Sequence, residues 1–301
     1  MRRMRKERMA LTSRRMFGIW CASAAFVATS ACNAPMVLTQ QVEARRVTLD
    51  LQVQFTKAAD AANRSVMSDT DDDAKAAARE AEQATQAVLR DVGQLESILK
   101  SMGYSEELRF LDTFSSRFAE YQKLDAEILP LAIENTNVKA QRLSFGPARE
   151  AADAFRTALE AAIKMARADD ASRADALAAR AILSVLEIEV LQAPHIAEAE
   201  DAPMTRMEAQ MAASEAAARK GLERIKSLLP PEAGPHLTAA VASLDRFKTI
   251  NADLIKLSRQ NSDVRSLALT LGRKRVLTAQ CDDQLRGLQE ALTKHTNPAT
   301  R

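Results

Sequence analysis

The chain has 301 residues, of which 47% are hydrophobic and 27% are charged, while aromatic residues make up only 4%. This composition favours Ala-rich helices over sheets, which need β-branched and aromatic residues, and the length suffices for two domains. The net charge is +2, but residues 1–15 carry +6, so the remainder carries −4. Because an acidic body lacks the electrostatic footprint of a nucleic-acid-binding protein, we expect no nucleic-acid partner.

Residues 1–35 are typical of an export signal, with a basic start, an apolar run and small residues after it. Arg14 and Arg15 lie in the run Ser-Arg-Arg-Met-Phe-Gly, which is similar to the twin-arginine export motif. The run Thr-Ser-Ala-Cys ending at Cys32 is similar to a lipobox, so we expect a lipid anchor on Cys32 and a location in the periplasm. The threonine stands where lipoproteins usually carry Leu, which leaves cleavage nearby or an uncleaved segment as alternatives. We expect no later segment to span the membrane.

Apolar residues at helical spacing predict four helices between residues 36 and 168. A polar turn over 68–73 separates the first two, and its Asp and Thr side chains suit a helix start. Gly103 is placed to end the second helix in a left-handed conformation. The apolar residues of the third helix form a core seam, and Pro130 within it predicts a kink.

The stretch 134–146 recurs 126 residues later as 260–272, so that Asn135 is matched by Asn261. Valine and glycine also recur in matching columns, and conservative exchanges fill most of the others. Self-similarity at the spacing of a domain predicts a duplication. We therefore expect the second half of the chain to repeat the four helices of the first.

The second set of helices covers residues 171–294, with an interruption at Pro194 and a clear break over 229–235. A new helix is expected near Ser172, although one continuous helix joining the repeats is the alternative, because no Gly or Pro forbids it. We expect residues 295–301 to be frayed. The predicted architecture is all-α, with two tandem up-down-up-down four-helix bundles and about eight long helices, over 36–168 and 171–294.

A residue pattern in both repeats is similar to the last two helices of a known sensory module. In the first repeat it consists of Phe118, Tyr121, Ile-Leu-Pro-Leu-Ala at 128–132, Asn135, Ala140 and Phe155. It resembles the four-helix-bundle sensory module of methyl-accepting chemotaxis receptors and sensor kinases, and the duplication resembles the bimodular helical sensors. We find no second transmembrane helix, signalling coiled coil or kinase in this sequence. The resemblance implies a sensory or ligand-binding module outside the cytoplasm that passes its ligand state to a membrane protein.

Polar residues at predicted helix ends form the candidate ligand site. Up-down topology would gather them at one end of a bundle, beside apolar seams, where basic side chains suit a small molecule such as a carboxylate. Capping and turn formation is the alternative role of these residue types. The candidates are Asn63, Arg64, Asn135, Asn137, Lys139, Arg142, Asn261, Asp263 and Arg265.

A weaker candidate is a copper or other metal site at His195, Met207 and Met211, because the two methionines share a helix face. The sequence positions no other His or Cys to complete it, and a polar helix end packed against Met residues is the alternative. The same residue types bind haem in some four-helix bundles, but the sequence has no CxxCH motif for covalent attachment, which leaves noncovalent haem as a remote alternative. We expect Cys281 to be a buried core residue.

The sequence carries no motif of a hydrolase, a metalloprotease or a phosphate-binding loop, so we predict neither an enzyme nor a cofactor. It predicts an exported sensory or ligand-binding module with a membrane protein partner. An envelope scaffold that docks another protein is the alternative, and a periplasmic metal carrier is a weaker one. An apolar stripe exposed on the outside of a bundle would favour the scaffold.

Overall fold

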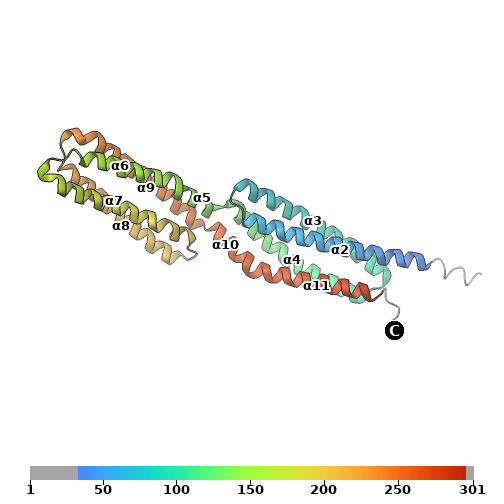
Figure 1. The fold of residues 1–301 in the computed structure, drawn as a ribbon. Coiled ribbons are helices and arrows are strands. Elements are labelled where there is room, and N and C mark those ends of the chain that lie inside the picture. The colour runs from blue at the N-terminus through green and yellow to red at the C-terminus, as the bar shows by residue number, and fades with distance from the viewer. Residues whose placement is uncertain (1–32, 296–301) are drawn as a thin grey trace, which may run out of the picture. The chain divides into compact units, whose positions relative to one another are not determined.

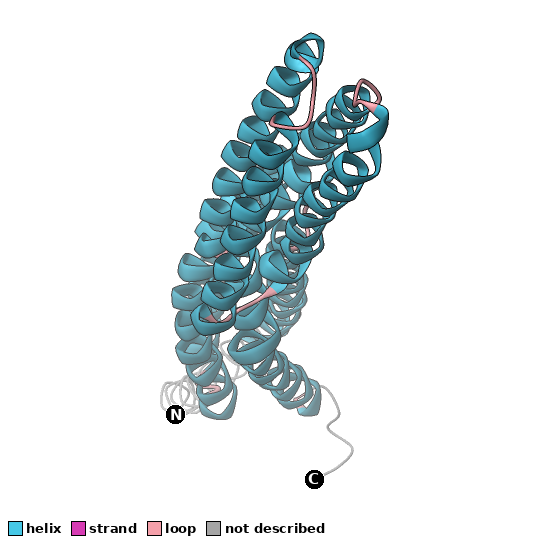
Figure 2. Ribbon diagram, turned by 90° about the vertical axis from the view of Figure 1, so that its left-hand side faces the viewer, coloured by secondary structure: helices cyan, strands magenta, loops and turns pink. Residues whose placement is uncertain are grey.

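The structure is a computed structural model that describes residues 33–295. These residues form helices and short connections and include no strand, which confirms the all-α class (Figures 1 and 2). Within this range, no helix has both the length and the apolar character that a membrane span requires. The predicted export motif at Arg14 and Arg15 and the predicted lipidation site at Cys32 lie outside the described residues.

The helices follow one another with few intervening residues. They are α2 (Asn33–Val66), α3 (Asp71–Met102), α4 (Ser105–Glu134), α5 (Thr136–Leu143), the π-helix η1 (Ser144–Ala148), α6 (Arg149–Ile163), α7 (Ala168–Ala197), α8 (Asp201–Lys226), the 3-10 helix η2 (Pro231–Ala233), α9 (Gly234–Gln260), α10 (Ser262–Leu269), the π-helix η3 (Thr270–Lys274) and α11 (Arg275–Lys294). The two π-helices lie at matching positions of the repeat.

One compact unit contains parts of α2, α3, α4 and α11, namely the described residues up to Asp60, Ala81–Gln122 and the residues from Val276. Its core includes a cluster of aromatic rings in which Phe55 makes edge-to-face contacts, with ring centroids 5.6 to 5.9 Å from those of three rings of α4. These rings belong to the predicted seam of the third helix. The seam residues are thus packing residues, as expected.

The other compact unit consists of Ala61–Glu80 and Lys123–Arg275. In it α7 pairs with α8, and α6 pairs with α9, so that four helices enclose one core (Figure 1). This core includes Phe155, Leu159, Val185, Ile188, Leu222, Leu244 and Phe247.

These units interleave along the chain and therefore differ from the predicted consecutive domains 36–168 and 171–294. The predicted duplication places α6 in the same domain as α4, but in the structure α6 packs with α7 and α9. The reason is the length of the connection, because Asn135 is the single residue between α4 and α5, and Asn261 is the single residue between α9 and α10. Helical hairpins use loops of about 2 to 5 residues, so neither asparagine forms the hairpin turn that the predicted up-down topology requires. The tandem up-down-up-down arrangement of eight long helices is not confirmed.

Several local predictions are confirmed. Gly103 has φ +71° and ends α3, where its N–H and that of Tyr104 donate to the carbonyls of Lys100 and Leu99. The hydroxyl of Thr70 accepts from the N–H of a residue in the first turn of α3, at 3.1 Å, as a cap does.

Two boundaries in the second repeat were predicted wrongly. Helix α7 begins at Ala168, before Ser172, and it runs past Pro194 to Ala197. Helix α4 also continues past Pro130 to its end at Glu134, and the kink predicted at Pro130 stays a prediction. A proline removes one hydrogen bond, and packing on both sides of it holds these helices together in spite of that loss.

Candidate functional site

Asn135 and Asn261 have φ angles of +51° and +56°, and among the described residues they are the only ones other than glycine with positive φ. Asparagine adopts this left-handed conformation more readily than other residues with a Cβ atom. Each asparagine precedes a short helix, α5 or α10. Together with the two residues that follow each of them, they form what we call the asparagine joint, Asn135–Asn137 and Asn261–Asp263.

The two halves of the asparagine joint bind each other reciprocally. The N–H of Thr136 donates to Oγ of Ser262 at 3.0 Å, and the N–H of Ser262 donates to Oγ1 of Thr136 at 3.1 Å. One position further, the N–H of Asn137 donates to Oδ2 of Asp263 at 2.7 Å, and the reverse bond to Oδ1 of Asn137 is 3.2 Å. Each half therefore caps the free N–H groups of the other half's helix.

The amide side chains bind the joint to the last turn of α7 and to the residue that follows this helix. Nδ2 of Asn261 donates to the carbonyl of Glu198 at 2.7 Å, and Nδ2 of Asn137 donates to the carbonyl of Ile196 at 2.6 Å and to Oδ1 of Asn261 at 3.0 Å. Burial raises the pKa of Asp263, against hydrogen bonds from backbone N–H groups that lower it. Asn135 has only a weak bond of this kind, at 3.5 Å to the carbonyl of Ser68.

The predicted cations next to the joint also bind protein groups. Lys139 pairs with Asp71 at 2.8 Å, and it donates to a backbone carbonyl at the end of α4. Arg142 donates to the backbone carbonyl of Asp69. Both side chains therefore tie α5 to the turn between α2 and α3, which lies in the same compact unit.

The remaining predicted ligand residues lie on the surface. Arg64 pairs with Glu80 at 2.6 Å, and the side chains of Asn63 and Arg265 are exposed. The structure thus brings Asn135, Asn137, Lys139, Arg142, Asn261 and Asp263 together, but it uses most of their polar groups in contacts with one another and with nearby turns. Capping and turn formation, the alternative considered for these residues, accounts for these contacts.

His195 is fully buried, and both of its ring nitrogens have partners. Nδ1 lies 2.8 Å from Oγ of Ser258, and Nε2 lies 2.9 Å from Oε1 of Glu208. Because the Ser258 hydroxyl already donates to the His195 carbonyl, at 2.9 Å, it accepts from Nδ1. Met211 is buried and Met207 half-buried on α8. Neither imidazole nitrogen is left for a metal ion, and the described residues contain no cluster of three His, Cys, Asp or Glu side chains that could hold one.

Two buried polar groups of this unit escaped the sequence analysis. Lys274 pairs with Asp125 at 2.5 Å, and both side chains are buried. Burial lowers the pKa of Lys274, and the nearby Asp125 charge raises it. In the other repeat Asn251 accepts from Nε2 of Gln192, at 2.9 Å. Asp125 and Asn251 are matching positions, 126 residues apart within apolar seams, and this coincidence was a usable signal.

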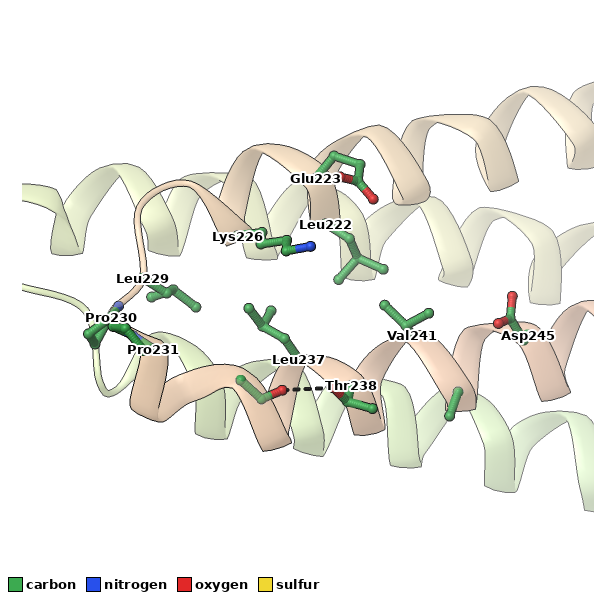
Figure 3. Close-up of a pocket in the computed structure, with 12 residues that line it drawn as sticks. Leu222, Glu223, Lys226, Leu229, Pro230, Pro231, Leu237, Thr238, Val241 and Asp245 are labelled. Atoms are coloured by element: carbon green, nitrogen blue, oxygen red, sulfur yellow. Dashed lines mark hydrogen bonds between the residues drawn. The ribbon is translucent and has the colours of Figure 1, made fainter.

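A pocket of about 540 Å³ opens between the end of α8 and the start of α9. Figure 3 shows its side chains facing one another across the space between these helices. The apolar lining consists of Leu222, Leu229, Pro230, Pro231, Leu237 and Val241. The sequence analysis treated 229–235 only as a break and Leu237 and Val241 only as core residues, so it missed this pocket.

Three charged side chains border the pocket. Asp245 forms an ion pair with Arg219 of α8, in which the distance from the guanidinium Nη2 to Oδ1 is 2.7 Å. Lys226 and Glu223 lie on one face of α8, three residues apart, and neither has a hydrogen-bond or ion-pair partner within residues 33–295. An ammonium and a carboxylate next to apolar walls can bind a small molecule that has both charged and apolar parts.

Two places in the described residues bring several polar or charged side chains together: the asparagine joint and the pocket between α8 and α9. The polar groups of the joint mostly bind each other, whereas those of the pocket include two without partners. Comparison with known proteins adds no assignment to either place: no model of a protein family matches the chain, and the search of curated proteins finds no match.

Proposed function

We propose that the chain is a non-enzymatic ligand-binding module of a sensory system, and that the pocket between α8 and α9 is its ligand site. The observation that carries this proposal is a cavity of about 540 Å³ with apolar walls and two unpartnered charges. Ligand pockets typically measure about 300 to 1,000 Å³ and combine apolar walls with a few polar groups. The resemblance to helical sensory modules supports the same function.

The ligand class follows from the pocket's chemistry. Lys226 supplies an ammonium that can donate to a carboxylate, and Glu223 supplies a carboxylate that can accept from an amine. The leucine side chains, with Val241 and the prolines, line the same pocket and offer an apolar surface. An amino acid with an aliphatic or aromatic side chain satisfies all three requirements.

The proposed signal is a change in helix packing. A ligand between α8 and α9 contacts two helices that share one core. Because packed cores switch between discrete arrangements rather than deforming continuously, ligand binding can favour one arrangement of these helices over another. Helix α9 continues through Asn261 into α10, η3 and α11, of which the residues from Val276 belong to the other compact unit. In this proposal each unit works as a four-helix bundle, and the chain is exported, lipid-anchored at Cys32 and read by a membrane protein.

Thermal unfolding of the full chain tests this site. L-leucine and L-phenylalanine are compared with 4-methylpentanoate and 3-phenylpropanoate, which lack the amine. A ligand present at 100 times its Kd adds about 2.7 kcal/mol to the native state. We expect a rise in Tm with the amino acids that is lost in Lys226→Ala and kept in Lys220→Ala, an exposed lysine of α8 outside the pocket. Equal shifts in both variants, or no shift with any amino acid, would refute the pocket as the site.

A second candidate function, the interaction scaffold, is favoured by a different observation. Leu183, Leu186 and Val190 on the outside of α7 are 53%, 49% and 66% exposed. Large apolar side chains grouped on a surface often mark a protein-binding site. The metal carrier is not proposed, because both nitrogens of His195 are already bound.

A further inference from the structure

Helix α7 is apolar on two opposite faces. One face contributes Leu177, Val185 and Ile188 to the core shared with α6, α8 and α9. The other face is exposed, and its residues follow one another at spacings of 3, 4, 3, 4 and 3. We call this surface the α7 stripe: Ala176, Ala179, Leu183, Leu186, Val190 and Ala193.

Such spacing is the heptad pattern of helices that pair with another helix. A helix at the surface of a monomer usually has one apolar stripe and an opposite polar face. The second stripe of α7 therefore needs a partner that the unit itself does not supply.

A groove runs beside the α7 stripe. It has a volume of about 510 Å³ and lies between α7 and α8, where Leu183, Leu186 and Val190 meet Gln210 and Ala213. The groove extends the apolar surface of the stripe toward α8. An apolar helix of a partner that lies along the stripe can cover the groove as well.

The charges next to the stripe point to the identity of the partner. Arg180 and Glu187 are exposed and lie seven residues apart, so they share the flank of α7 that faces α8, where Glu187 accepts from Ser214 at 2.8 Å. Seven residues of helix span ~10.5 Å, which is too far for Arg180 and Glu187 of one chain to pair. In an antiparallel helix pair equal flanks face each other, so each Arg180 meets the Glu187 of the other copy.

We propose that the α7 stripe binds a second copy of this chain, with the two α7 helices antiparallel about a two-fold axis that passes between Leu183 and Leu186. The interface is isologous, so Leu183 of one copy packs on Leu186 of the other, and the Arg180–Glu187 pair forms twice. This proposal does not depend on the ligand pocket, whose residues lie on another part of α8 and on α9.

The size of the stripe sets the expected affinity. Its 18 positions span ~27 Å of helix. Stable interfaces bury about 800 Å² per partner, and one helix pair of this length with alanines at both ends provides less than that. We expect a dimer with a Kd on the order of 10 μM, which sets the concentrations to be studied.

Sedimentation equilibrium of the full chain in mild detergent, at concentrations on both sides of that Kd, tests the proposal. Leu186→Ser removes an exposed apolar side chain and should yield a monomer. Arg180→Glu and Glu187→Arg should each weaken the dimer at least tenfold, because each places like charges together twice, and the double variant should restore it. Arg246→Glu, a reversal of the same size on α9, is the matched control and should leave the dimer unchanged.

The rescue is the decisive readout, because Arg180 and Glu187 can compensate each other only between copies. A chain that stays monomeric well above the expected Kd overturns the proposal, as does a dimer that Leu186→Ser leaves intact. A double variant no better than the single variants overturns the antiparallel arrangement. The same holds if Arg180→Glu disrupts the dimer while Glu187→Arg has no effect.

Discussion

Substitutions at the two asparagines of the joint separate the cost of a left-handed backbone from the value of the side-chain bonds. Glycine adopts positive φ freely, so Asn261→Gly removes only the side-chain bonds. Alanine at φ +56° loses the same bonds and adds steric strain of about 1 kcal/mol. The side chain of Asn261 binds the carbonyl of Glu198 at 2.7 Å and the amide of Asn137 at 3.0 Å. At about 1 kcal/mol for each bond, we expect losses of about 2 kcal/mol for Asn261→Gly and about 3 kcal/mol for Asn261→Ala.

Asn135 provides the internal control, because its backbone has the same left-handed conformation as that of Asn261 but its side chain forms weaker hydrogen bonds. Its bond to the carbonyl of Ser68 is 3.5 Å long, and its Oδ1 has no hydrogen-bond partner. We therefore expect Asn135→Gly to be nearly neutral and Asn135→Ala to cost about 1 kcal/mol. The four variants should form a ladder of about 3, 2, 1 and 0 kcal/mol in the free energy of unfolding.

Urea denaturation measures this ladder, provided that the m-value is the same in all variants, since a changed m-value indicates a different unfolded or native state. Equal losses for Ala and Gly at both sites would refute the left-handed conformation. A loss at Asn135 as large as that at Asn261 would instead refute the hydrogen-bond argument.

Three further predictions concern single side chains. An alanine Cβ at Gly287 would lie 2.5 Å from the ring of Phe110, so Gly287→Ala should lower the free energy of unfolding by about 1 kcal/mol or more. An alanine Cβ at Gly93 meets nothing within 4 Å, so Gly93→Ala should raise the free energy of unfolding by about 0.5 kcal/mol. Thermal melts measure both changes. A hydrogen bond from Arg259 lowers the pKa of Glu208. The ionised Glu208 therefore stabilises the folded chain above pH 4.5, and this stabilisation is lost as the pH falls through the lowered pKa. Glu208→Gln should therefore be less stable at pH 7 and lose less stability than the wild type between pH 5 and 3, and parallel pH curves would contradict this. Burial raises the pKa of Cys281 to about 12, so a thiol reagent at pH 8 should label native wild type and Cys281→Ser equally, and denaturant should add one reactive thiol only in the wild type.

Local chemistry in the sequence was enough to place most helices. Gly103 ended a helix as predicted, since only a glycine or an asparagine readily takes the left-handed position there. Apolar spacing identified the aromatic seam, and Cys281 proved to be a buried core residue. These features depend on neighbours within one or two turns, which a sequence shows directly.

The partners of the joint could not be predicted in the same way. Thr136, Asn137, Ser262 and Asp263 are residue types that serve equally as caps, turn residues or ligand-binding groups. What decides among these roles is a set of bonds across 126 residues of sequence, and local patterns contain no information about such pairs. The one-residue connection at Asn135 was equally hidden, because the residue type marks an interruption without showing where the next helix packs.

The repeat and the joint together explain why the compact units are discontinuous in the chain. Thr136 binds Ser262 and Asn137 binds Asp263, so each residue binds the residue at the matching position of the other repeat, 126 residues away. Contacts between matching positions are the mark of an isologous interface, as in a two-fold dimer. The exchange of α6 and α11 between the predicted halves has the same character, since in domain swapping equivalent elements change places. The chain therefore places the two helices that the repeat makes equivalent, α6 and α11, each in the unit opposite to the one that the predicted duplication assigns to it.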